Sequence, residues 1–382
     1  MVIRNIVGNV PEPDELYGRN DFIGHLWRQI QGNNILLLAP RRFGKTGVMR
    51  HVLMKPREGY LPIYFDLEDV DSPQEFVWRL TREVLSNDRL RQFVQKAKGI
   101  PQKVCSWVQD TFDEIAFAGA KVKFKESLTE DWRDTARRLL LQLEAFDQRI
   151  IFILDELPAM LEVIAERQGE DVAHNFMAWF RVVRLQQKDV LRRHRFVVGG
   201  SIGIDMILRR LKTTDKLNDF ERLYVQPLQA DTAMQLARDL AEAMDIQCDK
   251  QVIERLLAII GQPVPYFIHL FFSQLGQLAR NDRSPLTPET LELIYKQKIL
   301  GPTCKHYFNH YRERLRRYGT VGERAAVAIL STVAQQRRAS ASVLWDVYRK
   351  IKKRGASELG FAELMADLEC DWYLVLDPHT NE

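Results

Sequence analysis

Long apolar runs, clustered cysteines and a strong net charge are all missing from this chain of 382 residues. No apolar run approaches the ~20 residues that a membrane-spanning helix needs. The N-terminus lacks the basic stretch and apolar block of a secretion signal. The four cysteines lie far apart and form no Cys-x-x-Cys pair, which excludes a disulfide framework and is typical of reduced thiols. These absences predict a cytoplasmic protein with no membrane partner.

The charge is nearly balanced, with 55 basic and 51 acidic residues and a net charge of +4. This balance does not by itself predict nucleic-acid binding, which would require a local concentration of charge. At roughly 150 residues per domain, the length predicts two or three domains. The hydrophobic fraction of 46% supplies a large core without a metal or disulfide.

Short apolar runs alternate with helical patterns through residues 1–228, which is typical of a parallel α/β sheet covered by helices. The runs lack polar alternation, so we expect strands buried on both faces. Residues of about 72–146 carry a helical pattern and form a predicted insert between the second and third strands. The five predicted strands are Ile35–Ala39, Leu61–Phe65, Ile150–Leu154, Phe196–Gly199 and Leu223–Val225.

Helical patterns replace strands in the rest of the chain. Residues 229–310 are predicted to form a helical lid domain. Residues 311–382 are predicted to form three helices and then a strand at Trp372–Leu376, which is the order of a winged helix. The sequence ends at Glu382, inside the expected hairpin turn, so a truncated domain is one interpretation.

Residues 39–46 read Ala-Pro-Arg-Arg-Phe-Gly-Lys-Thr, directly after an apolar strand and before a helical pattern. In such a loop the backbone amides face phosphate oxygens, and Gly44 allows close approach. Lys45 is predicted to reach the β- and γ-phosphates, and Thr46 to ligate magnesium. A basic turn without a ligand is the alternative. The predicted nucleotide-binding residues here are Ala39, Pro40, Arg41, Arg42, Phe43, Gly44, Lys45, Thr46 and Gly47.

Two acids, Asp155 and Glu156, follow the third apolar strand. The first is predicted to hold magnesium, and the second to orient and deprotonate the attacking water. Alone, an acidic pair after a strand is as consistent with an ordinary loop. Ser201, just beyond the fourth strand, is predicted to sense the γ-phosphate, while a helix-capping serine is the alternative.

Together these motifs resemble the AAA+/STAND ATPases, especially the archaeal-type ATPase group, over about residues 16–279. The resemblance implies an α/β P-loop NTPase core with a parallel five-stranded sheet, with ATP and Mg²⁺ as cofactors. Residues 16–22 resemble the box that helps hold the adenine, which carries over to Gly18 and Arg19. The Gly-x-Pro motif at Gly261 implies that Pro263 packs near the base.

Residues 171–193 have a helical pattern with an apolar face and a basic stripe on the opposite face. The arginines of this stripe are the candidates for an arginine finger. In a homo-oligomer, Arg181, Arg184 or Arg192 could reach a neighbour's γ-phosphate. A solvated helix face is the favoured alternative. Further candidates are Arg209 and Arg210.

The helix expected at residues 357–371 carries five acids and neither lysine nor arginine. An acidic helix would be repelled by DNA phosphates, although the basic run at 349–354 could touch a DNA backbone. The leading hypothesis is therefore a slow ATPase that acts as a nucleotide-dependent switch on an unidentified protein partner. A DNA-acting AAA+ ATPase and a nucleotide-binding scaffold without turnover remain the alternatives.

Overall fold

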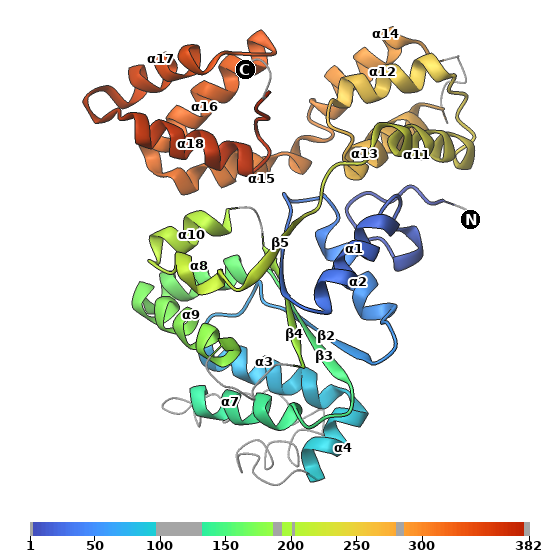
Figure 1. The fold of residues 1–382 in the computed structure, drawn as a ribbon. Coiled ribbons are helices and arrows are strands. Elements are labelled where there is room, and N and C mark those ends of the chain that lie inside the picture. The colour runs from blue at the N-terminus through green and yellow to red at the C-terminus, as the bar shows by residue number, and fades with distance from the viewer. Residues whose placement is uncertain (1–2, 97–131, 186–192, 201–202, 280–285, 378–382) are drawn as a thin grey trace. The chain divides into compact units, whose positions relative to one another are not determined.

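The computed structural model describes residues 3–96, 132–185, 193–200, 203–279 and 286–377 (Figure 1). The chain divides into two compact units. One comprises Val10–Val225, and the other comprises Met1–Asn9 together with Gln226–Glu382. The core unit therefore ends close to the predicted boundary at residue 228, whereas the predicted division at residue 310 stays a prediction.

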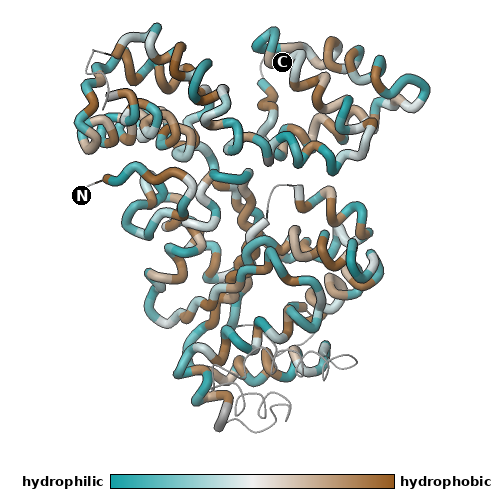
Figure 2. Tube along the Cα trace, turned by 180° about the vertical axis from the view of Figure 1, so that it is seen from behind, coloured by the Kyte–Doolittle hydropathy of each residue, from teal (hydrophilic) through white to brown (hydrophobic). Residues whose placement is uncertain are grey.

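The core unit is built on five strands that pair in parallel, in the order β2-β3-β4-β1-β5 (Figure 1). This confirms the predicted fold class. Figure 2 shows hydrophobic residues along the strands, and every residue of Ile150–Leu154 in β3 is buried, as its uninterrupted apolar run requires. The strands are β1 (Asn34–Leu38), β2 (Tyr60–Asp66), β3 (Arg149–Asp155), β4 (Arg195–Gly200) and β5 (Phe220–Tyr224).

The β5 strand lies at the edge of the sheet and begins at Phe220, three residues earlier than predicted. Glu221 and Arg222 in its middle are exposed, which an edge position permits and which hides the strand from a search for apolar runs.

Helices cover both faces of this sheet (Figure 1). On one side lie α1 (Asn20–Ile30) and α2 (Lys45–Met54), and on the other α8 (Leu157–Gln168), α9 (Glu170–Leu185) and α10 (Ile204–Arg210). Within the predicted insert, the described helices are α3 (Pro73–Ser86), α4 (Asp88–Lys96) and α7 (Trp132–Leu143).

The insert begins as its sequence predicts. The hydroxyl of Ser72 accepts a hydrogen bond from the Glu75 amide at 3.1 Å, and Pro73 occupies the first turn of α3.

The second unit is helical throughout its described residues (Figure 1). Its N-terminal segment is attached to α13, since the Ile6 amide donates a hydrogen bond to His269 Nδ1 at 3.3 Å. Its helices are α11 (Ala230–Ala243), α12 (Lys250–Ile260), α13 (Pro265–Ala279), α14 (Pro288–Ile294), α15 (Asn309–Arg314), α16 (Gly319–Gln336), α17 (Ala341–Lys352) and α18 (Glu358–Cys370). No described helix has both the length and the apolar character needed to cross a membrane.

The predicted strand at Trp372–Leu376 is wrong, because the structure has no strand among these residues. Trp372 has a left-handed backbone (φ 59°), which turns the chain back over the end of α18. The amides of Tyr373 and Leu374 then donate to the carbonyl of Leu368, at 2.9 and 3.4 Å. These amides cap a helix and are not available to a partner strand.

Candidate nucleotide-binding site

The loop between β1 and α2 has the backbone that phosphate binding requires. Gly44 is the N-cap of α2 and has φ 91°, a left-handed conformation that glycine adopts without strain. Lys45 and Thr46 form the first turn of the helix, whose unpaired amides and dipole favour an anion. The strand–loop–helix context predicted for residues 39–46 is therefore present.

The lysine and threonine of this loop meet both predicted acids. Lys45 Nζ lies 3.0 Å from Asp155 Oδ1 and 2.7 Å from Glu156 Oε1. The Thr46 hydroxyl donates to Asp155 Oδ2 at 2.9 Å. Residues far apart in the sequence thus form one cluster at the carboxyl ends of β1 and β3.

The strand order explains how this cluster forms. β4 lies between β1 and β3, with Leu38 beside Gly200 and Leu154 beside Val198. In parallel sheets, ligands bind outside the carboxyl ends of the strands, where the strand order reverses. Gly199 leaves room for the site, because a Cβ there would lie 2.5 Å from Asp155 Oδ1. Ser201, the predicted sensor, lies outside the described residues.

Burial and charge oppose each other in the Lys45–Asp155 pair. Burial alone would lower the pKa of Lys45, but the charges and hydrogen bonds of Asp155 and Glu156 raise that pKa. Burial would likewise raise the pKa of Asp155, but Lys45 and the hydroxyls of Thr46 and Tyr64 lower that pKa. Both groups therefore stay ionised around neutral pH.

Glu156 sits in an unusual backbone conformation. It is the N-cap of α8 and has φ 60°, a left-handed value that is rare outside glycine and asparagine. Its side chain is 35% exposed, whereas that of Asp155 is 3% exposed. A strained and accessible carboxylate beside a buried one suits the different roles predicted for the two acids.

One site residue was missed from the sequence. The hydroxyl of Tyr64 on β2 donates to Asp155 Oδ2 at 3.0 Å. Tyr64 lies within an apolar run, and a tyrosine in such a run is ordinarily interpreted as a core residue. Its position near the end of a strand could have signalled a role, but only with knowledge that β2 is the neighbour of β3.

Arg19, which the resemblance predicts to lie near the adenine, contacts the β1–α2 loop through its side chain. The guanidinium is buried and donates to the carbonyl of Phe43 at 3.3 Å. Burial lowers the pKa of Arg19 to about 10. Gly47 brings the preceding segment close, because a Cβ there would lie 2.9 Å from Leu16 Cδ1. Gly18 is exposed and left-handed, with φ 65°.

Two residues predicted from the resemblance stay predictions. Pro263 belongs to the other compact unit, before α13. Arg192 lies outside the described residues.

Arg184 is a buried structural residue and does not belong to a solvated basic stripe. Its side chain is fully buried and forms two hydrogen bonds of 2.9 Å with the carboxylate of Asp219. It also donates to the Phe180 and Lys216 carbonyls, at 2.8 and 2.6 Å. A guanidinium held in this way cannot extend into a neighbouring molecule. Arg181 is partly exposed and pairs with Asp215.

The residues of the cluster fit a magnesium ion bound together with a triphosphate. Thr46 and Asp155 offer a hydroxyl and a carboxylate, which are the oxygen ligands that Mg²⁺ uses in such sites. Among the described residues, no group of three or more His, Cys, Asp or Glu side chains could hold a metal alone. The remaining magnesium ligands would therefore be phosphate oxygens and water.

Comparison with known proteins identifies the fold. No family model and no curated protein matches the chain. The solved Walker-type ATPase of Pyrococcus abyssi aligns with a TM-score of 0.62 and 16% identity, over 98% of this chain and 95% of that one. The ORC2 protein of Aeropyrum pernix, solved as ADPNP–ADP complexes, aligns with a TM-score of 0.57 and 12% identity, over 99% and 92%.

This chain shares the P-loop ATPase fold. The alignments span nearly its whole length, so the likeness includes the helical unit as well as the sheet. At these identities the comparison establishes the fold, and the chemistry has to be argued from the residues of the site.

Proposed function

We propose that this chain binds ATP with Mg²⁺ and hydrolyses it. The observation that carries the proposal is the cluster in which Lys45 and Thr46 of the β1–α2 loop contact Asp155 and Glu156 after β3. Phosphoryl transfer needs this set: a cation for the phosphates, two oxygen ligands for the metal and a carboxylate for the attacking water. The left-handed Gly44 and the start of α2 complete a phosphate-binding loop.

The ion pair between Lys45 and Glu156 couples binding to catalysis. Lys45 holds the carboxylate of Glu156 at 2.7 Å. When Lys45 turns to a γ-phosphate, its attraction is shared and Glu156 becomes free to accept a proton from water. Thr46 and Asp155 would hold the metal, and magnesium bound there would neutralise charge on the phosphates.

Two variants test this assignment. Lys45→Ala removes the cation for phosphate, so binding of a fluorescent ATP analogue should be lost. Glu156→Gln keeps the shape but removes the base, so binding should persist while phosphate release falls by about 10²–10⁴-fold. Lys55→Ala and Glu166→Gln are matched controls, because Lys55 and Glu166 are exposed and lie outside the cluster. Unchanged turnover in Glu156→Gln would disprove the base assignment.

At a finer level, we propose a slow ATPase that works as a nucleotide-dependent switch on a protein partner. The charge of α18 supports a protein partner over DNA. Glu358, Glu363 and Glu369 on this helix are exposed, and the helix has no lysine or arginine. A helix of this charge would be repelled by phosphates in a DNA groove.

A DNA-acting ATPase is the second candidate because basic residues are exposed at the end of α17 and just after it. Arg349, Lys350, Lys353 and Arg354 are all exposed. ATP turnover measured with and without duplex DNA separates the two candidates. Stimulation that disappears in a Lys350→Gln, Lys353→Gln variant would favour the DNA-acting reading, and no phosphate release at all would favour a scaffold without turnover.

A further inference from the structure

The sheet places a tyrosine hydroxyl directly on the buried acid of the site. Tyr64 lies beside Ile153 in the β2–β3 pairing, so it shares a face of the sheet with Asp155, two residues further along β3. Its hydroxyl donates to Asp155 Oδ2 at 3.0 Å. This contact depends on β2 being the neighbour of β3, which is not apparent from the sequence.

The carboxylate of Asp155 accepts hydrogen bonds at both oxygens. Oδ2 accepts from Thr46 at 2.9 Å and from Tyr64, while Oδ1 accepts from Lys45 and from the Glu156 amide, each at 3.0 Å. Lys45 and Thr46 are the groups proposed to bind phosphate and magnesium. Among the described residues, the side chains that donate to Asp155 are those of Lys45, Thr46 and Tyr64, and Tyr64 is the one to which no ligand-binding role has been assigned.

We propose that Tyr64 is a positioning residue that holds Asp155 Oδ2 toward the Thr46 hydroxyl, so that the two oxygens bind one magnesium ion together. The inference rests on the proposed ATPase function. When Thr46 turns its lone pair and Lys45 its charge to the ligand, the Tyr64 hydroxyl and the Glu156 amide still fix the orientation of the carboxylate.

The Tyr64 phenol is the donor in its contact with Asp155. Burial, and next the negative charge of Asp155, raise the pKa of the phenol above its ordinary value. A protonated phenol donates one hydrogen bond, and Asp155 is the acceptor that it meets here.

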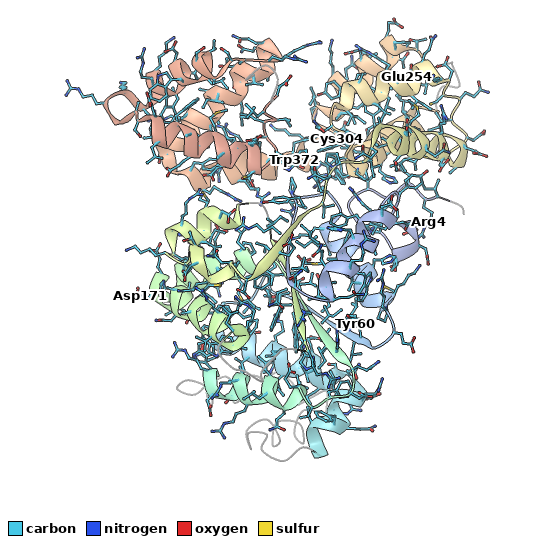
Figure 3. All side chains as sticks on the ribbon, in the orientation of Figure 1. Arg4, Tyr60, Asp171, Glu254, Cys304 and Trp372 are labelled. Atoms are coloured by element: carbon cyan, nitrogen blue, oxygen red, sulfur yellow. The ribbon has the colours of Figure 1, made fainter. Side chains whose placement is uncertain are left out.

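The experiment compares Tyr64→Phe with Tyr60→Phe in the full chain. Both variants lose one hydroxyl from β2, but Tyr60 lies at the opposite end of the strand, where its hydroxyl accepts from Arg149 at 3.5 Å (Figure 3). Binding of Mn²⁺, a spectroscopic substitute for Mg²⁺, is measured by electron paramagnetic resonance with saturating ADP. Binding of ADP itself is measured separately in EDTA.

Tyr64→Phe should weaken Mn²⁺ binding about tenfold, equivalent to about 1.4 kcal/mol, because a hydrogen bond to a charged group is lost. ADP binding in EDTA should stay at the wild-type level. The Mg²⁺ concentration for half-maximal hydrolysis should rise by a similar factor, while the rate at saturating Mg²⁺ recovers. Tyr60→Phe should match the wild type throughout.

A double-mutant cycle tests whether Tyr64 acts through Asp155. In an Asp155→Asn background, Tyr64→Phe should have no further effect on Mn²⁺ binding. Full additivity, or an equal loss of ADP binding in EDTA, would show a general structural role and overturn the proposal. Wild-type metal affinity in Tyr64→Phe would do the same. A wild-type protein that binds no nucleotide would instead refute the proposed function, and the role of Tyr64 with it.

Discussion

Gly199 offers the sharpest test of how tightly the site is built. This residue lies near the end of β4, the strand between β1, which leads into the β1–α2 loop, and β3, which leads into the two acids. A Cβ at Gly199 would lie 2.5 Å from Asp155 Oδ1 and 2.5 Å from Met49 Cε. The methionine end can move, but the carboxylate is held by Lys45, Thr46 and Tyr64. Gly199→Ala must therefore displace the carboxylate or the strand.

The expected stability loss follows from the crowding. Overpacking of a buried site costs about 1–3 kcal/mol. For a unit of this size, about 2–4 °C is lost per kcal/mol, so the midpoint of thermal unfolding should fall by about 2–12 °C. Displacing Asp155 by an ångström should also lower ATP turnover about a hundredfold, because catalytic geometry is that sensitive.

Gly200→Ala is the matched control one residue further along the strand. Its added Cβ would meet Pro158 Cγ at 3.3 Å, which a small shift relieves. This variant should lose about 1 kcal/mol or less and keep most of its activity. Differential scanning calorimetry and phosphate release measure both effects. Equal midpoints and equal turnover in the two alanine variants would refute the reasoning, because they would show that Asp155 tolerates the intrusion.

Two further predictions concern buried titratable side chains. Burial lowers the pKa of His194 to about 4, below the ordinary 6.5, so its contribution to stability is full above pH 6.5 and is lost as the pH falls. From pH 7.5 to 5, the wild type should lose about 2 kcal/mol more unfolding free energy than His194→Gln, measured by urea titration, and parallel losses would contradict this. Arg184→Met strands the carboxylate of Asp219 and should destabilise the protein by about 3–5 kcal/mol. Arg181→Met, at a half-exposed pair, should cost less than about 1 kcal/mol in the same titration, and similar losses in both variants would argue against the buried clamp.

The hydrogen bonds of His194 also favour its neutral form. Its Nδ1 accepts from the Ile150 amide at 2.9 Å, and its Nε2 lies 2.8 Å from the Leu143 carbonyl. This arrangement fits the neutral ring with its proton on Nε2, a tautomer assigned from the two partners. A second proton on Nδ1 would break the hydrogen bond from the Ile150 amide. At low pH the contact that His194 makes between Leu143 of α7 and Ile150 of β3 is therefore weakened.

Local sequence patterns predicted most of the strands, the β1–α2 loop and the two acids of the site. Continuous apolar runs predicted the strands because a strand buried on both faces leaves no room for polar alternation. The loop at residues 39–46 and the two acids could be proposed as site residues because the members of each are adjacent in sequence and follow such runs. The prediction of a strand at Trp372–Leu376 was wrong because an apolar run is not specific to strands. Such a run also suits a chain that packs across a helix end, as Tyr373 and Leu374 do.

Sequence by itself determined the candidate residues for binding phosphate and metal, since the loop from Ala39 to Thr46 and the pair Asp155 and Glu156 are recognised from their immediate neighbours. Only the tertiary structure decided which distant groups act on them. Tyr64 reaches Asp155 because β2 pairs with β3, and Gly199 must be small because β4 enters between β1 and β3. Arg184 is buried in an ion pair because the fold places Asp219 beside it. These contacts join segments that are far apart in the chain, so their cause is strand order and packing, which no local pattern records.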